Sequence, residues 1–160
     1  MKPVMLATDG SPTAEAATET AIELAQLLDT DLVVATVWNI RYTTVGLAPA
    51  PISGDLAKLS EEQARKIVVD AGARAEEVGV ETRTLLLRGL PVEEICLAAD
   101  KYEPRFLVIG SHGWGALKRA LFGSVSTGVL HHAKCPVLVV RTAEPSVAAA
   151  ANGAAERVHA

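Results

Sequence analysis

Aromatic residues make up only 4% of the 160-residue sequence, although 49% of it is hydrophobic. The core is therefore expected to be aliphatic, built mainly from Ala, Val, Leu and Ile. The sequence also lacks an apolar run long enough to span a bilayer. Its N-terminus, MKPVMLATDG, lacks the long apolar segment and cleavage site of a signal peptide. These absences predict a soluble, cytoplasmic protein, and the length suits one domain with a full core.

The sequence also has few cysteines and no excess of positively charged residues. Cys96 and Cys135 are the two cysteines, and their spacing does not match a metal site. In a cytosolic chain two buried free thiols are a more common arrangement than a disulfide. Lys and Arg number 15 against 19 Asp and Glu, for a formal net charge of −4. This balance disfavours general binding to DNA, RNA or anionic membranes.

Short apolar runs alternate with longer stretches of helical periodicity. Ser11 is placed to cap the first helix, with Pro12 at its first position. Residues 41–54, rich in Pro and Gly, are predicted to form an irregular loop that acts as a lid. The Ala-rich residues 143–160 are predicted to be a disordered tail. The expected strands are 2–9, 31–40, 81–89, 105–111 and 135–142, and the later helices are 56–78, 90–103 and 124–133.

This alternation predicts an α/β fold. Right-handed crossovers between successive strands give a parallel sheet that is covered by helices on both faces. We expect a single doubly wound domain over residues 1–142, because the sequence shows no internal repeat and no second domain.

The segment GSHGWGALKRALFGSVS, from Gly110 to Ser126, is rich in glycine. It starts where the fourth strand ends, and open α/β sheets bind ligands at the carboxyl ends of their strands. It runs into the last helix, whose N-terminus offers unpaired N–H groups and a partial positive charge. Glycine permits positive φ and a close approach of the backbone to a ligand. The hydroxyls of Ser124 and Ser126 and the charges of Lys118 and Arg119 would suit phosphate groups.

Two common phosphate-binding patterns do not fit this segment. Gly115-Ala116 interrupts the Walker pattern, and Lys118 stands where the dinucleotide pattern GxGxxG needs its third glycine.

A third pattern fits. The spacing Gly110-x2-Gly113-x9-Gly123-Ser124 resembles the nucleotide-binding motif of the universal stress protein family. The resemblance covers nearly all of the expected domain, from LATDGSPTAEAA through LVVATV and RGLPVEEI to VIGSHGWGALKRALFGSVSTGVLHHAKCPVLVVR. It implies a five-stranded parallel sheet in the order 3-2-1-4-5, which would bring Asp9 next to Gly110.

The resemblance also implies a role for each motif residue. Asp9 would contact the ribose and adenine end of ATP, and Val37 would contact the adenine. The phosphates, with their Mg²⁺, would be held by Gly110, Gly113, Gly123 and Ser124. His112 and Trp114 occupy variable positions of the motif, and Trp114 is a candidate for controlling access.

Simpler interpretations of the same residues stay open. The glycines could merely shape a sharp strand-to-helix connection, and Asp9 could only cap the first helix. Val37 could be core. His131 and His132 are adjacent on a helix and point about 100° apart, so they fit a helix C-terminus better than a metal pair.

The leading hypothesis is an ATP-binding protein with a nucleotide-responsive regulatory or protective role. No second acid, His or Lys is clearly placed at the γ-phosphate, so efficient catalysis is not expected. The alternatives are a slow ATPase or nucleotidyl-transfer enzyme, and an interaction module that binds AMP, cyclic AMP or nothing.

We also expect a homodimer through the last strand, Pro136–Arg141, because an apolar edge strand is a template for pairing and family members commonly dimerise there.

Overall fold

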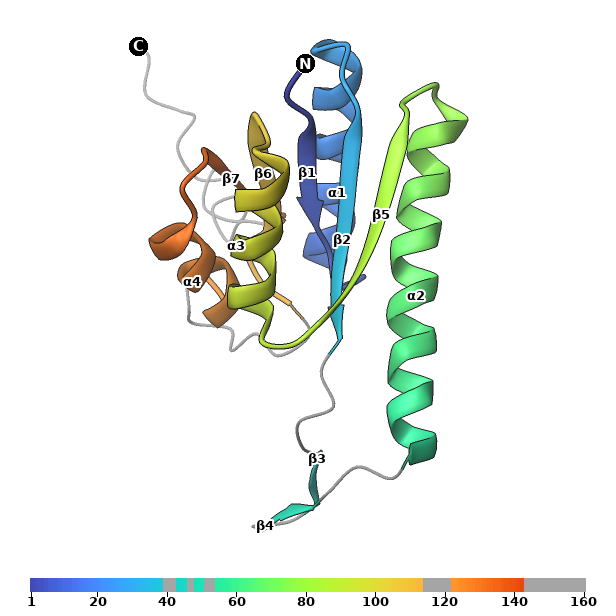
Figure 1. Ribbon diagram of the computed structural model, residues 1–160, viewed down its shortest axis with the longest axis vertical. Helices are drawn as coiled ribbons and strands as arrows, with labels where there is room; N and C mark the ends of the chain where they lie inside the picture. The colour runs from blue at the N-terminus through green and yellow to red at the C-terminus, as the bar shows by residue number, and fades with distance from the viewer. Residues whose placement is uncertain (39–42, 46–47, 51–53, 114–121, 143–160) are drawn as a thin grey trace, which may run out of the picture.

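The computed structural model describes residues 1–38, 43–45, 48–50, 54–113 and 122–142 (Figure 1). The predicted tail and the residues Trp114, Lys118 and Arg119 lie outside the described residues, as does much of the predicted lid.

The five predicted strands and four predicted helices are all present, with strands that are a few residues shorter than expected. In addition, the predicted irregular loop contains two three-residue strands, which pair antiparallel. The elements in chain order are β1 (Val4–Ala7), α1 (Pro12–Leu27), β2 (Leu32–Trp38), β3 (Thr43–Val45), β4 (Ala48–Ala50), α2 (Gly54–Glu77), β5 (Thr82–Arg88), α3 (Pro91–Tyr102), β6 (Phe106–Gly110), α4 (Ser124–His132) and β7 (Val137–Val140).

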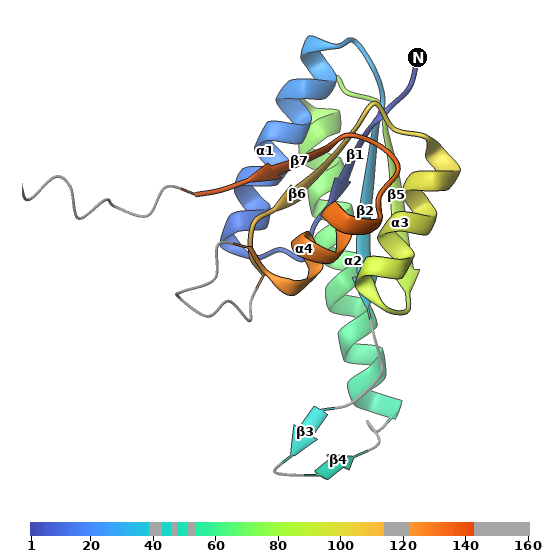
Figure 2. The same cartoon turned by 90° about the vertical axis from the view of Figure 1, so that its left-hand side faces the viewer.

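The main sheet is parallel throughout, with the order β5-β2-β1-β6-β7. Counted along the chain without the β3–β4 pair, this is the predicted order 3-2-1-4-5. Helices α1 and α2 cover one face, and α3 and α4 cover the other (Figures 1 and 2). The chain reverses direction across the sheet between β1 and β6, so the switch point lies where these two strands end.

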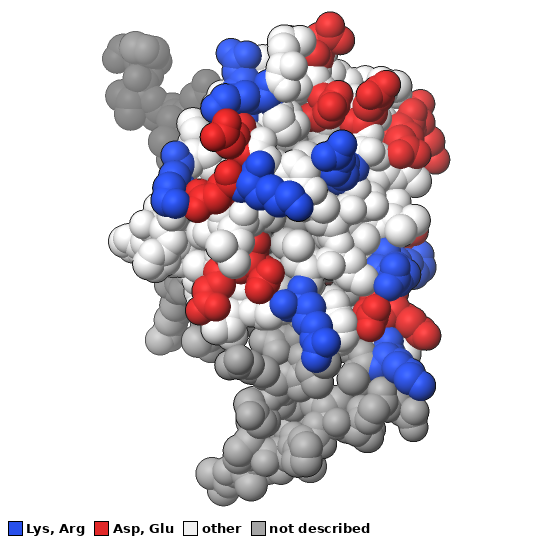
Figure 3. All heavy atoms as spheres, viewed as in Figure 1, with Lys and Arg blue, Asp and Glu red and all other residues white. Residues whose placement is uncertain are grey.

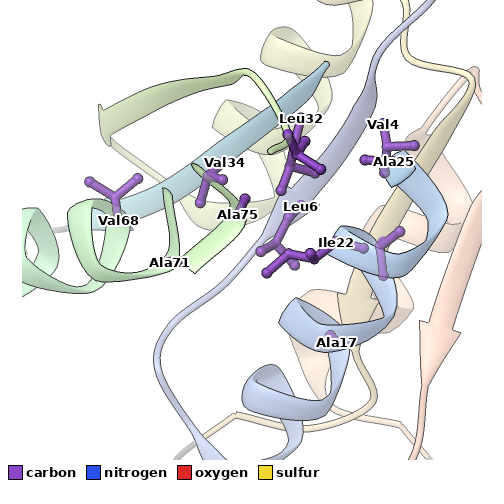
Figure 4. Close-up of a cluster of buried hydrophobic side chains, with 13 residues drawn as sticks. Val4, Leu6, Ala17, Ile22, Ala25, Leu32, Val34, Val68, Ala71 and Ala75 are labelled. Carbon is purple, nitrogen blue, oxygen red and sulfur yellow. The ribbon is translucent and has the colours of Figure 1, made fainter. Parts of the chain in front are cut away.

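Successive side chains of β1 point to opposite faces of the sheet, as in any strand. They therefore contribute to two separate aliphatic clusters of the core, one on each face. Val4 and Leu6 face α1 and α2, whereas Met5 and Ala7 face α3 and α4. Figure 4 shows Leu6 pointing toward Ile22 of α1, with the side chains of β2 beside it. The buried side of α1 consists mainly of alanines, which let the helix lie close to the sheet.

The first helix begins as predicted. Ser11 is the N-cap residue, its side chain accepts a hydrogen bond from the Ala14 N–H at 3.4 Å, and Pro12 follows it. This bond satisfies one of the N–H groups that a helix start leaves without a partner.

The two cysteines are free, as predicted, but they are only partly buried. Cys96 lies on α3 beside a surface groove that α4 borders, and Cys135 lies in the short connection before β7. Burial raises the pKa of both thiols, and the Asp100 carboxylate adds to the rise at Cys96. Both groups therefore stay protonated at neutral pH.

No helix within the described ranges is long and apolar enough to cross a membrane. On the face drawn in Figure 3, Lys and Arg side chains are interspersed with Asp and Glu. That face carries no continuous basic patch of the kind that attracts a polyanion.

Candidate functional site

A cavity of about 470 Å³ opens where β1 and β6 end, between the first turn of α1 and the N-terminal halves of α3 and α4. This volume falls within the range of small-molecule sites, roughly 300–1,000 Å³. All six residues predicted to bind a nucleotide line the cavity: Asp9, Val37, Gly110, Gly113, Gly123 and Ser124.

One side of the cavity is apolar and belongs to the core. Ala7, at the end of β1, and Ala35, in the middle of β2, have small side chains that leave room. Ile95 of α3 and Ile109 of β6 also line this wall. Val37 lines the cavity and also packs against this core cluster. Both interpretations of Val37 are therefore compatible with its position.

The Asp9 side chain is held in a turn before α1. Its Oδ1 atom accepts a hydrogen bond from the Ser11 N–H at 3.0 Å. Its Oδ2 atom lies so close to Gly113 that any Cβ there would collide with it. The carboxylate thus does support the helix start, as the simpler interpretation proposed. It also faces Gly113 in residues 111–113, the described start of the glycine-rich segment, which is called the glycine loop below.

Close approach, and not positive φ, explains the first two motif glycines. A Cβ at Gly110 would lie 3.0 Å from the carbonyl carbon and oxygen of Thr13 and from the Ala14 nitrogen. Gly113 is crowded by Asp9 in the same way. Positive φ occurs instead at Gly10, Gly79 and Gly89, none of which belongs to the motif.

Gly123 is different from the other two. The atoms nearest to an added Cβ, in His112 and Ser111, would be 3.5 Å away, which is ordinary contact. Its backbone is extended, with φ −71° and ψ 166°. Among the described residues, neither close packing nor a positive φ requires a glycine at this position.

The start of α4 faces the cavity with its backbone. Gly123 is the N-cap residue and provides no side-chain cap, and Ser124 and Val125 line the cavity. The first turn of α4 holds no acidic residue, whereas the first turns of α1 and α3 hold Glu15 and the pair Glu93 and Glu94. Of these three helices, α4 is the one with no carboxylate in its own first turn to compensate its N-terminal partial charge.

Ser126 does not fit its predicted role as a donor to a phosphate. Its side chain is buried, and its hydroxyl contacts the Ser111 carbonyl oxygen at 2.9 Å and that of Gly123 at 3.0 Å. The Gly123 N–H also donates to the Ser111 carbonyl, at 2.7 Å. Ser126 also lines the cavity, but its hydroxyl bonds inward and connects α4 to the residue after β6, whereas Ser124 is exposed at the cavity.

Sequence reasoning missed the contribution of α1 to the site. The hydroxyls of Thr13 and Ser11 both donate to the His112 carbonyl oxygen, the second at 3.3 Å. The residues that form these bonds are about 100 positions apart in the sequence, and no local sequence pattern predicts such a contact. Phe122, which is 38% exposed at the cavity, was missed as well.

The site contains few groups for acid–base or metal chemistry. Among the described residues that line the cavity, Asp9 is the one carboxylate and His112 the one imidazole. The His112 Nδ1 atom lies 3.0 Å from the Ser111 hydroxyl. No group of three or more His, Cys, Asp or Glu in the described part of the chain is arranged to hold a metal ion.

Comparison with known proteins agrees with the geometry. The model of the universal stress protein family matches residues 1–141. A universal stress protein of Methanocaldococcus jannaschii is 36% identical over 141 residues, which are 88% of this chain and 82% of the relative.

Solved structures show the same fold. The universal stress protein UspA of Lactobacillus plantarum superposes with a TM-score of 0.75 at 24% identity, over 88% of this chain and 97% of its own. A universal stress protein crystallised in complex with cAMP superposes with a TM-score of 0.66 at 26% identity, over 89% and 98% of the two chains.

Proposed function

The chain belongs to the universal stress protein family, and from this premise we propose that it binds ATP in the cavity and has a nucleotide-responsive regulatory or protective role. The observation that carries the proposal is the uncapped N-terminus of α4 at one side of a cavity whose other side is apolar. A ligand that satisfies both sides has a flat apolar part and an anionic part, as a nucleotide does.

The positions of the strands indicate which part lies where. Val37 is on β2, the motif glycines begin at Gly110, the last residue of β6, and β1 lies between the two strands. Adjacent strands are roughly 4.8 Å apart, so roughly 10 Å separate the two sides. The base would contact Val37 and Ile95, and the phosphates would lie at Gly113, Gly123 and Ser124.

Asp9 lies between these two sides. An ionised carboxylate accepts hydrogen bonds only, so it suits the hydroxyl groups of a ribose and would repel a phosphate. The Mg²⁺ would come with the triphosphate, because the described part of the chain has no cluster of metal ligands. This assignment keeps the predicted roles of Asp9, Val37, Gly113, Gly123 and Ser124, whereas the space beside Gly110 is taken by the first turn of α1.

A binding function is preferred to an enzymatic one. Efficient phosphoryl transfer needs a residue that orients the nucleophile as well as charge stabilisation, and Asp9 is the one carboxylate among the described residues that line the cavity. A slow ATPase is the enzymatic alternative, and a turnover assay separates the two.

A second candidate is a smaller adenine nucleotide in the same cavity. The cAMP complex of the relative at 26% identity favours it.

The assembly would be a cytoplasmic homodimer joined through β7, which is an edge strand of the main sheet.

Native mass spectrometry of freshly purified protein, with chromatography of the released ligand, tests the proposal. We expect a bound adenine nucleotide, and calorimetric titrations should then show binding of ATP, AMP and adenosine. Asp9→Ala should weaken all three alike, whereas Asp70→Ala, on the exposed side of α2, should change none. A protein that binds no adenine nucleotide at millimolar concentration would contradict the proposal.

A further inference from the structure

The two carbonyl groups that follow β6 are held by hydroxyls from different helices. The Ser126 hydroxyl of α4 lies 2.9 Å from the Ser111 carbonyl oxygen. The Thr13 hydroxyl of α1 donates to the next carbonyl, that of His112, which Ser11 supports at 3.3 Å. The glycine loop is therefore held between the N-termini of α1 and α4.

These bonds determine where the backbone donors of the loop point. In a trans peptide the C=O group and the following N–H group point in opposite directions, and the described residues contain no cis peptide bond. The His112 carbonyl points to the first turn of α1, so the Gly113 N–H points away from that turn. The Ser111 carbonyl points to α4, so the His112 N–H points away from α4.

The short contact at Gly110 makes the bond from Thr13 possible. A Cβ at Gly110 would lie 3.0 Å from the Thr13 carbonyl group. Without a side chain there, the first turn of α1 rests directly on the end of β6. Thr13 is then near enough to reach a carbonyl group two residues beyond Gly110 in the sequence.

We propose that Thr13 is a positioning residue for the phosphates of the bound nucleotide. By holding the His112 carbonyl, its hydroxyl fixes the peptide plane that carries the Gly113 N–H, and this N–H donates to a phosphate oxygen. The proposal rests on the proposed function and adds to it a residue outside the glycine motif. It assigns the phosphate-binding conformation of the loop to a helix that precedes the loop by about 100 residues.

Thr13→Val tests this role, because it removes the hydroxyl and keeps the shape of the side chain. ATP affinity should fall about 3- to 10-fold, the range expected from the net contribution of one hydrogen bond. Adenosine affinity should not change, because adenosine has no phosphate. Thr13→Ser keeps a hydroxyl and should restore ATP affinity.

Thr20→Val is the matched control, since Thr20 lies on the same helix and its hydroxyl donates to the Ala16 carbonyl at 2.9 Å, away from the cavity. It should leave both affinities unchanged. Calorimetry gives the ratio of the two affinities, and melting curves record any loss of stability separately.

Three results would overturn the inference. They are a Thr13→Val protein that binds ATP as tightly as the parent, one that loses ATP and adenosine to the same extent, and a Thr13→Ser protein that is no better than Thr13→Val. The failure of the proposed function looks different, because the parent protein itself would then bind neither ATP nor adenosine.

Discussion

At the scale of single residues, the motif glycines are alike in sequence but not in their surroundings. Gly110 lies under the first turn of α1, and Gly113 lies under the Asp9 carboxylate. A side chain at Gly110 would press on backbone atoms, whereas one at Gly113 would have to displace the end of the Asp9 side chain. At Gly123 an added methyl group meets only ordinary contacts, so this glycine separates ligand binding from folding.

Gly123→Ala is therefore expected to fold normally and to bind ATP several-fold more weakly than the parent, because the methyl group would occupy space that a phosphate needs. Gly110→Ala is the contrasting variant. There the methyl group meets backbone atoms at 3.0 Å, and overpacking of this kind costs about 1–3 kcal/mol of stability. Melting curves and titrations with ATP and adenosine measure both effects. A stable Gly123→Ala protein with parental ATP affinity would remove the main support for a phosphate at α4.

The sequence predicted the residues of the site better than their contacts. The spacing of the motif identified four of the residues that line the cavity, Gly110, Gly113, Gly123 and Ser124, and the resemblance to the family added Asp9 and Val37. It did not reveal that Ser126 bonds inward to Ser111, or that Thr13 reaches His112. Hydroxyls have several possible partners, and only the packed structure decides between them.

At the scale of elements, β7 is an edge strand that touches the core on both faces, since Val140 packs against the cluster beneath α1 and α2. Val139 packs against the cluster beneath α3 and α4, whereas Leu138 is 37% exposed. An exposed apolar edge favours pairing with a second chain. The alternation along the strand therefore makes Leu138 the informative position for a dimer, and Val139 a position whose change would damage the core.

Leu138→Lys is expected to shift a homodimer toward monomer, because two chains paired along β7 would bring the new charges together. Size-exclusion chromatography with light scattering at micromolar concentration measures the shift. Leu97→Lys is the matched control, since Leu97 is 63% exposed on α3 and away from the edge. A parent protein that is already monomeric, or a Leu138→Lys protein that remains fully dimeric, would exclude a β7 interface.

The elements themselves followed from hydrophobic periodicity, with one exception. Each of the five strands of the main sheet was predicted within a few residues. The inner strands β1, β2 and β6 are largely buried apolar runs, whereas the edge strands β5 and β7 are partly exposed. The pair β3 and β4 was missed, because residues 43–50 contain Gly and Pro and lack an apolar run bounded by turns. Pro49 lies within β4, and a proline normally argues against a strand.

At the scale of the whole molecule, alternation of strands and helices predicts a parallel sheet but not the order of its strands. Val4–Ala7 is buried from end to end, which indicates a central strand. The burial of β1 does not tell which strands are its neighbours, and so does not predict that β6 lies beside β1 while β5 does not. The order came from the resemblance to the family, and it is this order that brings Asp9 of the first turn against a glycine loop about 100 residues later.

The assembled cavity predicts that ATP stabilises the whole domain. A ligand that binds only the folded state at 100 times its dissociation constant adds about 2.7 kcal/mol. For a domain of this size each kcal/mol raises the melting temperature by about 2–4 °C, so ATP should raise it by roughly 5–10 °C. Adenosine at the same concentration should have a smaller effect, because it does not reach the N-terminus of α4.

Differential scanning fluorimetry with ATP, adenosine and inorganic triphosphate measures these shifts. In Gly123→Ala the advantage of ATP over adenosine should shrink, while the shift from adenosine stays. Equal shifts from ATP and adenosine in the parent protein would mean that the start of α4 does not bind phosphate.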